Sequence, residues 1–118
     1  MNAAKTTDEL ASDRASVLTE LVEVAEGAIV SRVLASSSGG NVTLFAFDSG
    51  QGLSEHTAPF DALVQVVDGR FDVTIGGTEI AVGAGEIVLM PAGVPHALRA
   101  PEPALMLLTM LREPNPED

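Results

Sequence analysis

Short apolar runs, separated by glycine- and proline-containing turns, recur along the chain from residue 28 to residue 111. The runs are rich in Val, Ile, Leu and Phe, the residues favoured in strands. Short strands separated by such turns about every eight to twelve residues are typical of an all-β sandwich or barrel rather than of βαβ units. The expected strands lie at 28–34, 42–47, 62–67, 71–75, 80–82, 87–90, 96–98 and 105–111.

The two ends of the chain follow other patterns. Residues 16–25 (SVLTELVEVA) carry apolar side chains at helical spacing behind a serine, which predicts a short helix. We expect this helix to belong to an N-terminal segment, residues 1–27, that is partly mobile and precedes a barrel over 28–111. The last stretch, residues 112–118 (REPNPED), holds two prolines and three acidic residues and predicts a flexible acidic tail.

Two of the expected strands are apolar at nearly every position instead of alternating. They are residues 105–111 (LMLLTML) and residues 87–90 (IVLM). A small closed barrel needs an apolar inward face only, so an apolar outer face is expected to be covered as well. The simplest cover is a second copy of the chain, which predicts a homodimer. The alternative is a set of isolated surface leucines, which are common on soluble proteins.

Charge and composition narrow the classes of partner. Six basic and seventeen acidic residues give a formal net charge of −11. Such a field repels polyanions, so neither nucleic acids nor anionic membrane surfaces are expected as partners. No apolar run approaches the roughly 18 residues of a membrane-spanning helix. The sequence has no cysteine, which excludes disulfides, zinc–thiolate sites and cysteine nucleophiles and fits a reducing compartment. We expect a cytoplasmic protein, because the polar first residues contain no apolar core of a secretory signal.

The two histidines of the chain lie in two segments with regularly spaced glycines. Residues 50–69 read GQGLSEHTAPFDALVQVVDG and contain His56. Residues 85–100 read GEIVLMPAGVPHALRA and contain His96. In the second segment a glycine turn, a short apolar run and a Pro-Ala-Gly turn follow one another, which is the chemistry of strand, turn and strand.

These two segments resemble the signature motifs of the cupin superfamily, and of small single-domain bacterial cupins in particular. The first motif places a glycine before an H-x-H pair, a glutamate and a second glycine, and Gly50, His56 and Gly69 fall on it. The second motif places a glycine before P-x-G, a histidine and an asparagine. The residues that match it are Gly85, Pro91, Gly93 and His96. The resemblance implies a double-stranded β-helix, the cupin jelly-roll barrel.

The chain departs from the family pattern at the metal site. The complete cupin site uses both histidines of H-x-H, the glutamate and the histidine of the second motif. Of these positions His56 and His96 remain, while Ala58 and Ala62 stand at the second histidine and the glutamate. The resemblance therefore implies a reduced two-histidine site for a divalent transition metal, Fe, Mn, Ni or Zn. Two imidazoles leave the coordination of such an ion incomplete, because these ions usually take at least three protein ligands.

The alanines leave room for a small apolar pocket beside the two histidines. Strand alternation gives its expected lining: Phe45, Phe47, Ala58, Ala62, Val64, Met90 and Leu98. Met106 and Met110 also qualify, although methionine is more typical as a gap-filler than as a ligand. Four residues are candidates for polar support: Arg32, Gln51, Asp61 and Gln65. Alternation points Asp61 away from the histidines, and a bend at Pro59 would be needed to turn it inward.

Two kinds of function follow, and the sequence does not decide whether the protein is an enzyme. The first is a metal-dependent oxygenase or lyase that acts on a small organic substrate, with the metal as Lewis acid and template. The alternative is a non-enzymatic cupin that binds or senses a small ligand without a metal. The chain has no tyrosine, so the sugar-nucleotide epimerase type of cupin, which relies on a tyrosine acid, is excluded.

Overall fold

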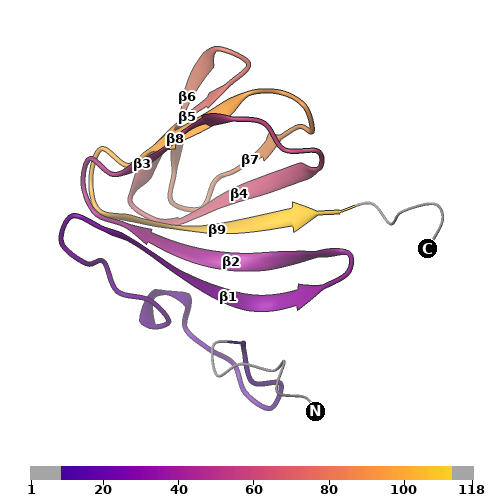
Figure 1. Ribbon diagram of the computed structural model, residues 1–118. Coiled ribbons are helices and arrows are strands. Elements are labelled where there is room, and N and C mark those ends of the chain that lie inside the picture. Colours follow the sequence, from indigo (N-terminus) through magenta and orange to yellow (C-terminus); the bar gives the residue numbers. More distant parts are fainter. Residues whose placement is uncertain (1–8, 113–118) are drawn as a thin grey trace.

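The computed structural model describes residues 9–112, and within them the chain is almost entirely β-structure (Figure 1). One 3-10 turn, η1 (Leu18–Glu20), precedes the strands. The strands are β1 (Ile29–Ser37), β2 (Gly40–Phe47), β3 (Gly52–His56), β4 (Asp61–Asp68), β5 (Arg70–Ile75), β6 (Thr78–Gly83), β7 (Ile87–Met90), β8 (His96–Arg99) and β9 (Ala104–Leu111). No helix in this part of the chain is long and apolar enough to cross a membrane.

The strands form two antiparallel sheets that face one another (Figure 1). Sheet A has the order β1-β2-β9-β4-β7, and sheet B has the order β3-β8-β5-β6. Strands that are distant in sequence, such as β2 and β9, are neighbours in the sheet, as in a jelly roll. The predicted all-β jelly-roll barrel is therefore confirmed.

The core lies between the sheets and follows from alternation along each strand. On β4, Ala62, Val64 and Val66 point inward and are buried, whereas Asp61 and Gln65 are exposed. The facing side chains of both sheets join them in one cluster of buried apolar residues.

The N-terminal segment covers part of the outer face of sheet A. Val22 is buried there, with Leu18 and Leu21 beside it, against a second apolar cluster of the sheet that contains Leu34, Leu44, Ala46 and Leu105. The helix predicted over 16–25 is reduced to the single turn η1. Val17, which precedes this turn, makes no capping side-chain hydrogen bond, and helices shorter than about 12 residues are marginal without support. Packing of the apolar side chains on the sheet takes the place of the helix.

Two parts of the predicted organisation concern the chain ends. Residues 1–8 of the N-terminal segment lie outside the described residues, and so does the expected acidic tail except for Arg112. The guanidinium of Arg112 lies 5.5 Å from the centroid of the Phe60 ring.

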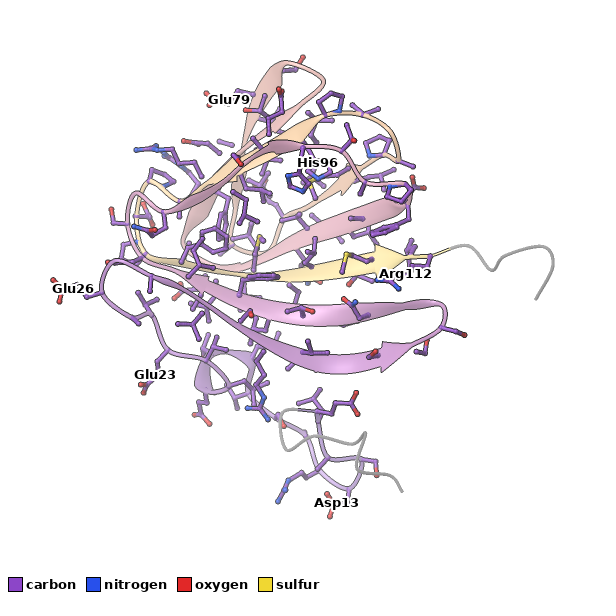
Figure 2. The ribbon with its side chains drawn as sticks, viewed as in Figure 1. Asp13, Glu23, Glu26, Glu79, His96 and Arg112 are labelled. Carbon is purple, nitrogen blue, oxygen red and sulfur yellow. The ribbon has the colours of Figure 1, made fainter. Side chains whose placement is uncertain are left out.

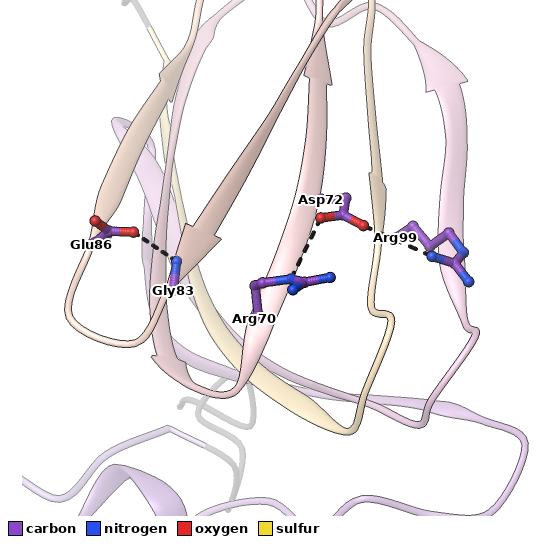
Figure 3. A network of polar contacts seen from close by, with 5 residues as sticks. All are labelled: Arg70, Asp72, Gly83, Glu86 and Arg99. Carbon is purple, nitrogen blue, oxygen red and sulfur yellow. Dashed lines mark hydrogen bonds and ion pairs between the residues drawn. The ribbon is translucent and has the colours of Figure 1, made fainter.

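The outer face of sheet B is polar, unlike that of sheet A. The Asp72 carboxylate lies between Arg70 on the same strand and Arg99 on the neighbouring strand, with N–O distances of 3.6 and 3.8 Å (Figure 3). Nearby, the Glu86 carboxylate accepts a 2.8 Å hydrogen bond from the Gly83 backbone N–H. Exposed ion pairs of this kind contribute only about 0–1 kcal/mol each, so this face is a solvated surface.

Candidate functional site

The two histidines are brought together by an irregularity in sheet B. Leu53 on β3 pairs with Leu98 on β8, yet His56 pairs with His96. Three steps on β3 therefore match two on β8, which means that β3 carries one extra residue, a β-bulge. In a regular strand residues three apart point to opposite faces. The bulge cancels this alternation, so that Leu53 and His56 both face the inside of the barrel.

The two imidazole rings are in direct contact through Nε2. The Nε2 atoms of His56 and His96 are 3.1 Å apart, and the ring centroids are 4.4 Å apart at an interplanar angle of 74°. His96 is only 4% exposed and lies between the sheets (Figure 2). His56 is exposed. One ring of the pair is therefore buried inside the barrel, and the other is in contact with solvent.

Backbone carbonyls determine which ring nitrogen carries hydrogen. The His56 Nδ1 atom lies 2.8 Å from the Ser54 carbonyl oxygen, and the His96 Nδ1 atom lies 3.2 Å from that of Val94. A carbonyl oxygen only accepts hydrogen bonds, so each Nδ1 must donate and carry the hydrogen. In the neutral rings both Nε2 atoms then hold lone pairs, and these lone pairs face one another.

Two facing lone pairs repel unless a proton or another cation lies between them. Burial lowers the pKa of His96 below its ordinary value of 6.5, and a positive charge on His56 lowers it further, while the bond to Val94 acts in the opposite direction. Protonation of both rings at once is therefore disfavoured. The two Nε2 atoms can therefore share one proton or one metal ion.

A cavity of about 330 Å³ opens beside the pair. Its size is that of a small-molecule site, and its wall is apolar except for the two histidines and Thr57. The lining residues are Leu53, His56, Thr57, Ala58, Pro59, Phe60, Ala62, Met90, His96, Leu98, Met106, Leu108 and Met110.

Comparison with known proteins identifies the family. The model of the cupin domain matches residues 43–110. The chain belongs to the cupin family. A conserved protein of unknown function from Streptococcus pyogenes is 32% identical to this cupin, over 97% of this chain and 100% of its own, with a TM-score of 0.86.

Two further relatives agree with this assignment. A cupin superfamily protein from Desulfitobacterium hafniense is 27% identical, covers 88% of this cupin and 95% of its own chain, and has a TM-score of 0.83. An uncharacterized protein from Streptomyces coelicolor is 32% identical over 75 residues, which are 64% of this chain and 71% of that protein. The relatives thus extend the family and fold to the whole barrel without naming a reaction.

The cavity of this cupin contains some of the residues expected from the sequence and excludes others. Ala58, Ala62, Met90 and Leu98 line it together with both histidines. The other three expected lining residues, Phe45, Phe47 and Val64, are not part of the wall and belong to the packed core behind it. Alternation shows that these three residues point inward, but it does not show which end of the barrel each one occupies.

The four polar residues considered as support, Arg32, Gln51, Asp61 and Gln65, are not part of the cavity wall. Arg32 is on the outer face of sheet A and donates to the Leu21 carbonyl oxygen at 3.3 Å. Asp61 accepts a 2.8 Å bond from the Ala92 backbone N–H. Gln65 is exposed on the outer face, and Gln51 lies in the turn before β3. Regular alternation on β4 places Asp61 and Gln65 outside, and no bend at Pro59 reverses it.

Several lining residues were not found from the sequence. Leu108 has the same parity on β9 as Met106 and Met110, so alternation gave a signal for it. Leu53 has no such signal, because the bulge interrupts the pattern. Pro59 and Phe60 come from the connection between β3 and β4, where no periodicity applies.

The donor atoms fit the role of metal ligands in one respect and fall short in another. Each histidine presents a lone pair at Nε2 and donates Nδ1–H to a carbonyl, the arrangement usual for histidine ligands. Over residues 9–112, however, no group of three or more His, Cys, Asp or Glu side chains converges on a point. The pair therefore fits two adjacent ligands of a metal ion, and the remaining positions must be filled by other donors.

Proposed function

We propose that this cupin binds a transition metal ion through Nε2 of His56 and His96 and a small, mainly apolar organic molecule in the adjoining cavity. The observation that supports this best is the 3.1 Å separation of two Nε2 atoms whose lone pairs converge because both Nδ1 atoms are held by carbonyls. A cation between the rings relieves the repulsion and uses both lone pairs. The alanines at positions 58 and 62 leave open the space where two further ligands stand in the cupin motif.

The residues of the cavity suit binding and positioning rather than proton transfer. A bound metal would supply Lewis acidity and a template for the substrate. The Nδ1 hydrogen bonds hold the rings, and the apolar wall excludes water and accommodates the apolar body of the ligand. The wall contains no carboxylate, lysine or tyrosine to act as an acid or base once both histidines are engaged. We therefore assign the reaction to the class of oxygenases or lyases in which the chain itself supplies no further acid or base.

A second candidate function is the binding or sensing of a small ligand without a metal. It is favoured by the apolar wall and by the loss of two ligand positions to alanine. In this case the Nε2 atoms accept a hydrogen bond from the polar end of the ligand, for example a hydroxyl group.

Metal analysis separates the two candidates. The protein is purified without an affinity tag, and its metal content is measured by mass spectrometry beside that of the double variant His56→Ala/His96→Ala. About one metal ion per chain, lost in the double variant, supports the first function. A metal-free protein that still takes up a small molecule supports the second. Metal retained by the double variant would contradict the two-histidine site. Thr57→Ala is the matched control in the same wall and keeps its metal.

We further infer that the protein is a homodimer that uses the outer face of β7. Ile87 and Leu89 are 58% and 48% exposed there, beside Leu63, in the part of sheet A that the N-terminal segment leaves uncovered. A second copy of the chain is the simplest partner for these side chains, because the same apolar patch on two subunits can pack against itself across a two-fold axis. The cytoplasmic location stays a prediction from the sequence.

Sedimentation equilibrium tests the dimer. Leu89→Glu is expected to give a monomer, because two carboxylates would be brought together in the interface. Ile80→Glu is the matched control, since Ile80 is a similarly exposed apolar residue at 38% but lies on sheet B. It should leave the dimer intact. A wild-type monomer, or a dimer that survives Leu89→Glu, would contradict the proposal.

A further inference from the structure

We infer that the two-histidine site of this cupin is built for a soft monovalent ion, Cu(I), with the thioethers of Met90 and Met110 as additional ligands. The inference rests on the proposed metal site and specifies which ion it prefers. It replaces the Fe, Mn, Ni or Zn that the family resemblance implies with an ion chosen by the donors of this chain.

The inference rests on the side chains that neighbour Ala62 across the sheet. Ala62 stands where the cupin motif has its glutamate ligand, and it has a cross-strand partner on each side: Met90 on β7 and Met110 on β9. Side chains directly opposite in antiparallel strands lie on the same face, with Cβ atoms about 4.5–5.5 Å apart. Both methionines line the cavity together with the histidines. At the site of the missing carboxylate, the chain therefore has a methyl group flanked by two thioethers.

The chemical character of the donors favours copper. Thioethers are soft ligands that suit Cu(I), whereas imidazole suits zinc, copper, iron and nickel alike, and carboxylates are the ligands that manganese and magnesium prefer. The thioethers are therefore the donors that favour copper. The cavity wall offers imidazole and thioether, and it has neither carboxylate nor thiolate. Tetrahedral zinc gains little from a thioether, so two imidazoles leave its coordination incomplete.

The electrostatics of the cavity point the same way. His56 is exposed to solvent, but His96 is 4% exposed and Met90 is 2% exposed, so an ion held by these groups loses part of its hydration. The cost of transferring an ion out of water grows with the square of its charge, and neutral ligands do not offset it. Imidazole and thioether are both neutral. A monovalent ion therefore meets a much smaller penalty in this site than a divalent one.

The test compares Cu(I) and Zn(II) binding by metal-free protein. Cu(I) is titrated under anaerobic conditions against a chromophoric Cu(I) chelator, and Zn(II) against a zinc indicator. The wild type is expected to take up one Cu(I) per chain and to bind it more tightly than Zn(II). Copper K-edge absorption should show both nitrogen and sulfur scatterers.

Methionine-to-leucine variants show whether the sulfur atoms are ligands or packing. The swap nearly conserves the side-chain volume, so the barrel should remain folded. Met90→Leu/Met110→Leu is expected to weaken Cu(I) binding by about tenfold or more, the scale on which metal sites respond to altered surroundings, and to leave Zn(II) binding unchanged. Leu105→Met is the matched control: it makes the reverse swap on β9, but in the outer apolar cluster of sheet A and outside the cavity, so Cu(I) binding should not change.

The outcomes distinguish this inference from the proposed function. Unchanged Cu(I) affinity in the double methionine variant would overturn the inference, because the thioethers would then serve only in packing. Tighter binding of Zn(II) than of Cu(I) by the wild type would also overturn it, while leaving the two-histidine metal site in place. Failure of the wild type to bind Cu(I) would overturn the inference, and purified protein that carries no metal ion and binds neither Cu(I) nor Zn(II) would overturn the proposed metal site as well. Loss of the sulfur scatterers in Met90→Leu/Met110→Leu, with the nitrogen scatterers retained, would support both.

Discussion

The two ends of the barrel are built from the same alternating strands but are packed differently. At one end the rings of Phe47 and Phe71 meet edge to face, with centroids 4.9 Å apart, and both side chains are fully buried. At the other end Ala58 and Ala62 border the cavity of about 330 Å³. β9 runs from the packed end to the cavity, since its first residue, Ala104, pairs with Phe47 and its later residue Met110 pairs with Ala62.

The difference shows that an inward-facing alanine does not by itself create a cavity. Ala104 is completely buried, because the large Phe47 side chain fills the space beside it. Ala62 is also buried, but its neighbours across the sheet are flexible methionines, and space remains. The size and rigidity of the side chains on the neighbouring strands, rather than the presence of an alanine, decide whether that part of the barrel is packed core or a cavity.

The largest expected effect is the loss of an aromatic ring at the packed end. Phe71→Ala should lower the free energy of unfolding by about 3–5 kcal/mol, because it removes a fully buried ring and leaves a void. Leu108→Ala at the cavity should cost about 2 kcal/mol, the low end for such substitutions, because Leu108 is only partly buried and already borders empty space. Urea denaturation measures both. Equal losses would mean that the two ends are packed alike.

A smaller effect is expected when the alanines are enlarged. Ala104→Leu should destabilise the protein by about 1–3 kcal/mol, because the added atoms meet a filled core. Ala62→Leu should change stability by less than about 1 kcal/mol, because the added atoms enter the cavity, and it should block the uptake of ligands there. Thermal and urea unfolding of the two variants side by side provide the measurement. A similar penalty at both positions would contradict the contrast between the two ends.

Much of the fold was predictable from the sequence, because local patterns determine it. Alternation on β4 separates inward Ala62 from outward Asp61 without any knowledge of the partner strands. Gly69 ends the same strand with a φ of 76°, and a Cβ there would lie 2.6 Å from the Pro103 carbonyl oxygen, which explains the glycine of the first motif. The helix expected over 16–25 failed because packing on sheet A decides the form of that segment.

The site was less predictable, because it depends on register. The motif resemblance identified His56 and His96 as a pair, and the structure places them in contact. The bulge that turns both rings to the same side is defined only by the pairing of β3 with β8, which no pattern within β3 reveals. The division of the inner face into core and cavity likewise depends on which side chains meet across strands, as for Phe47 and Ala104.

The smallest expected effect concerns pH and belongs to the cavity end alone. Burial and the neighbouring His56 hold the pKa of His96 below 6.5 in the folded protein, while the unfolded chain titrates near that ordinary value. As the pH falls below 6.5, the unfolded chain takes up more protons than the folded protein does. The free energy of unfolding is therefore highest above pH 6.5 and decreases as the pH falls through the lowered pKa of His96. Urea midpoints of metal-free protein at steps from about pH 7.5 to 5.5 should therefore decrease. His96→Gln should flatten this decrease, whereas an unchanged slope in that variant would place the titrating group elsewhere. Asp48 does not interfere, because hydrogen bonds from the Gly27 and Ser49 backbone N–H groups hold its pKa below 3.8.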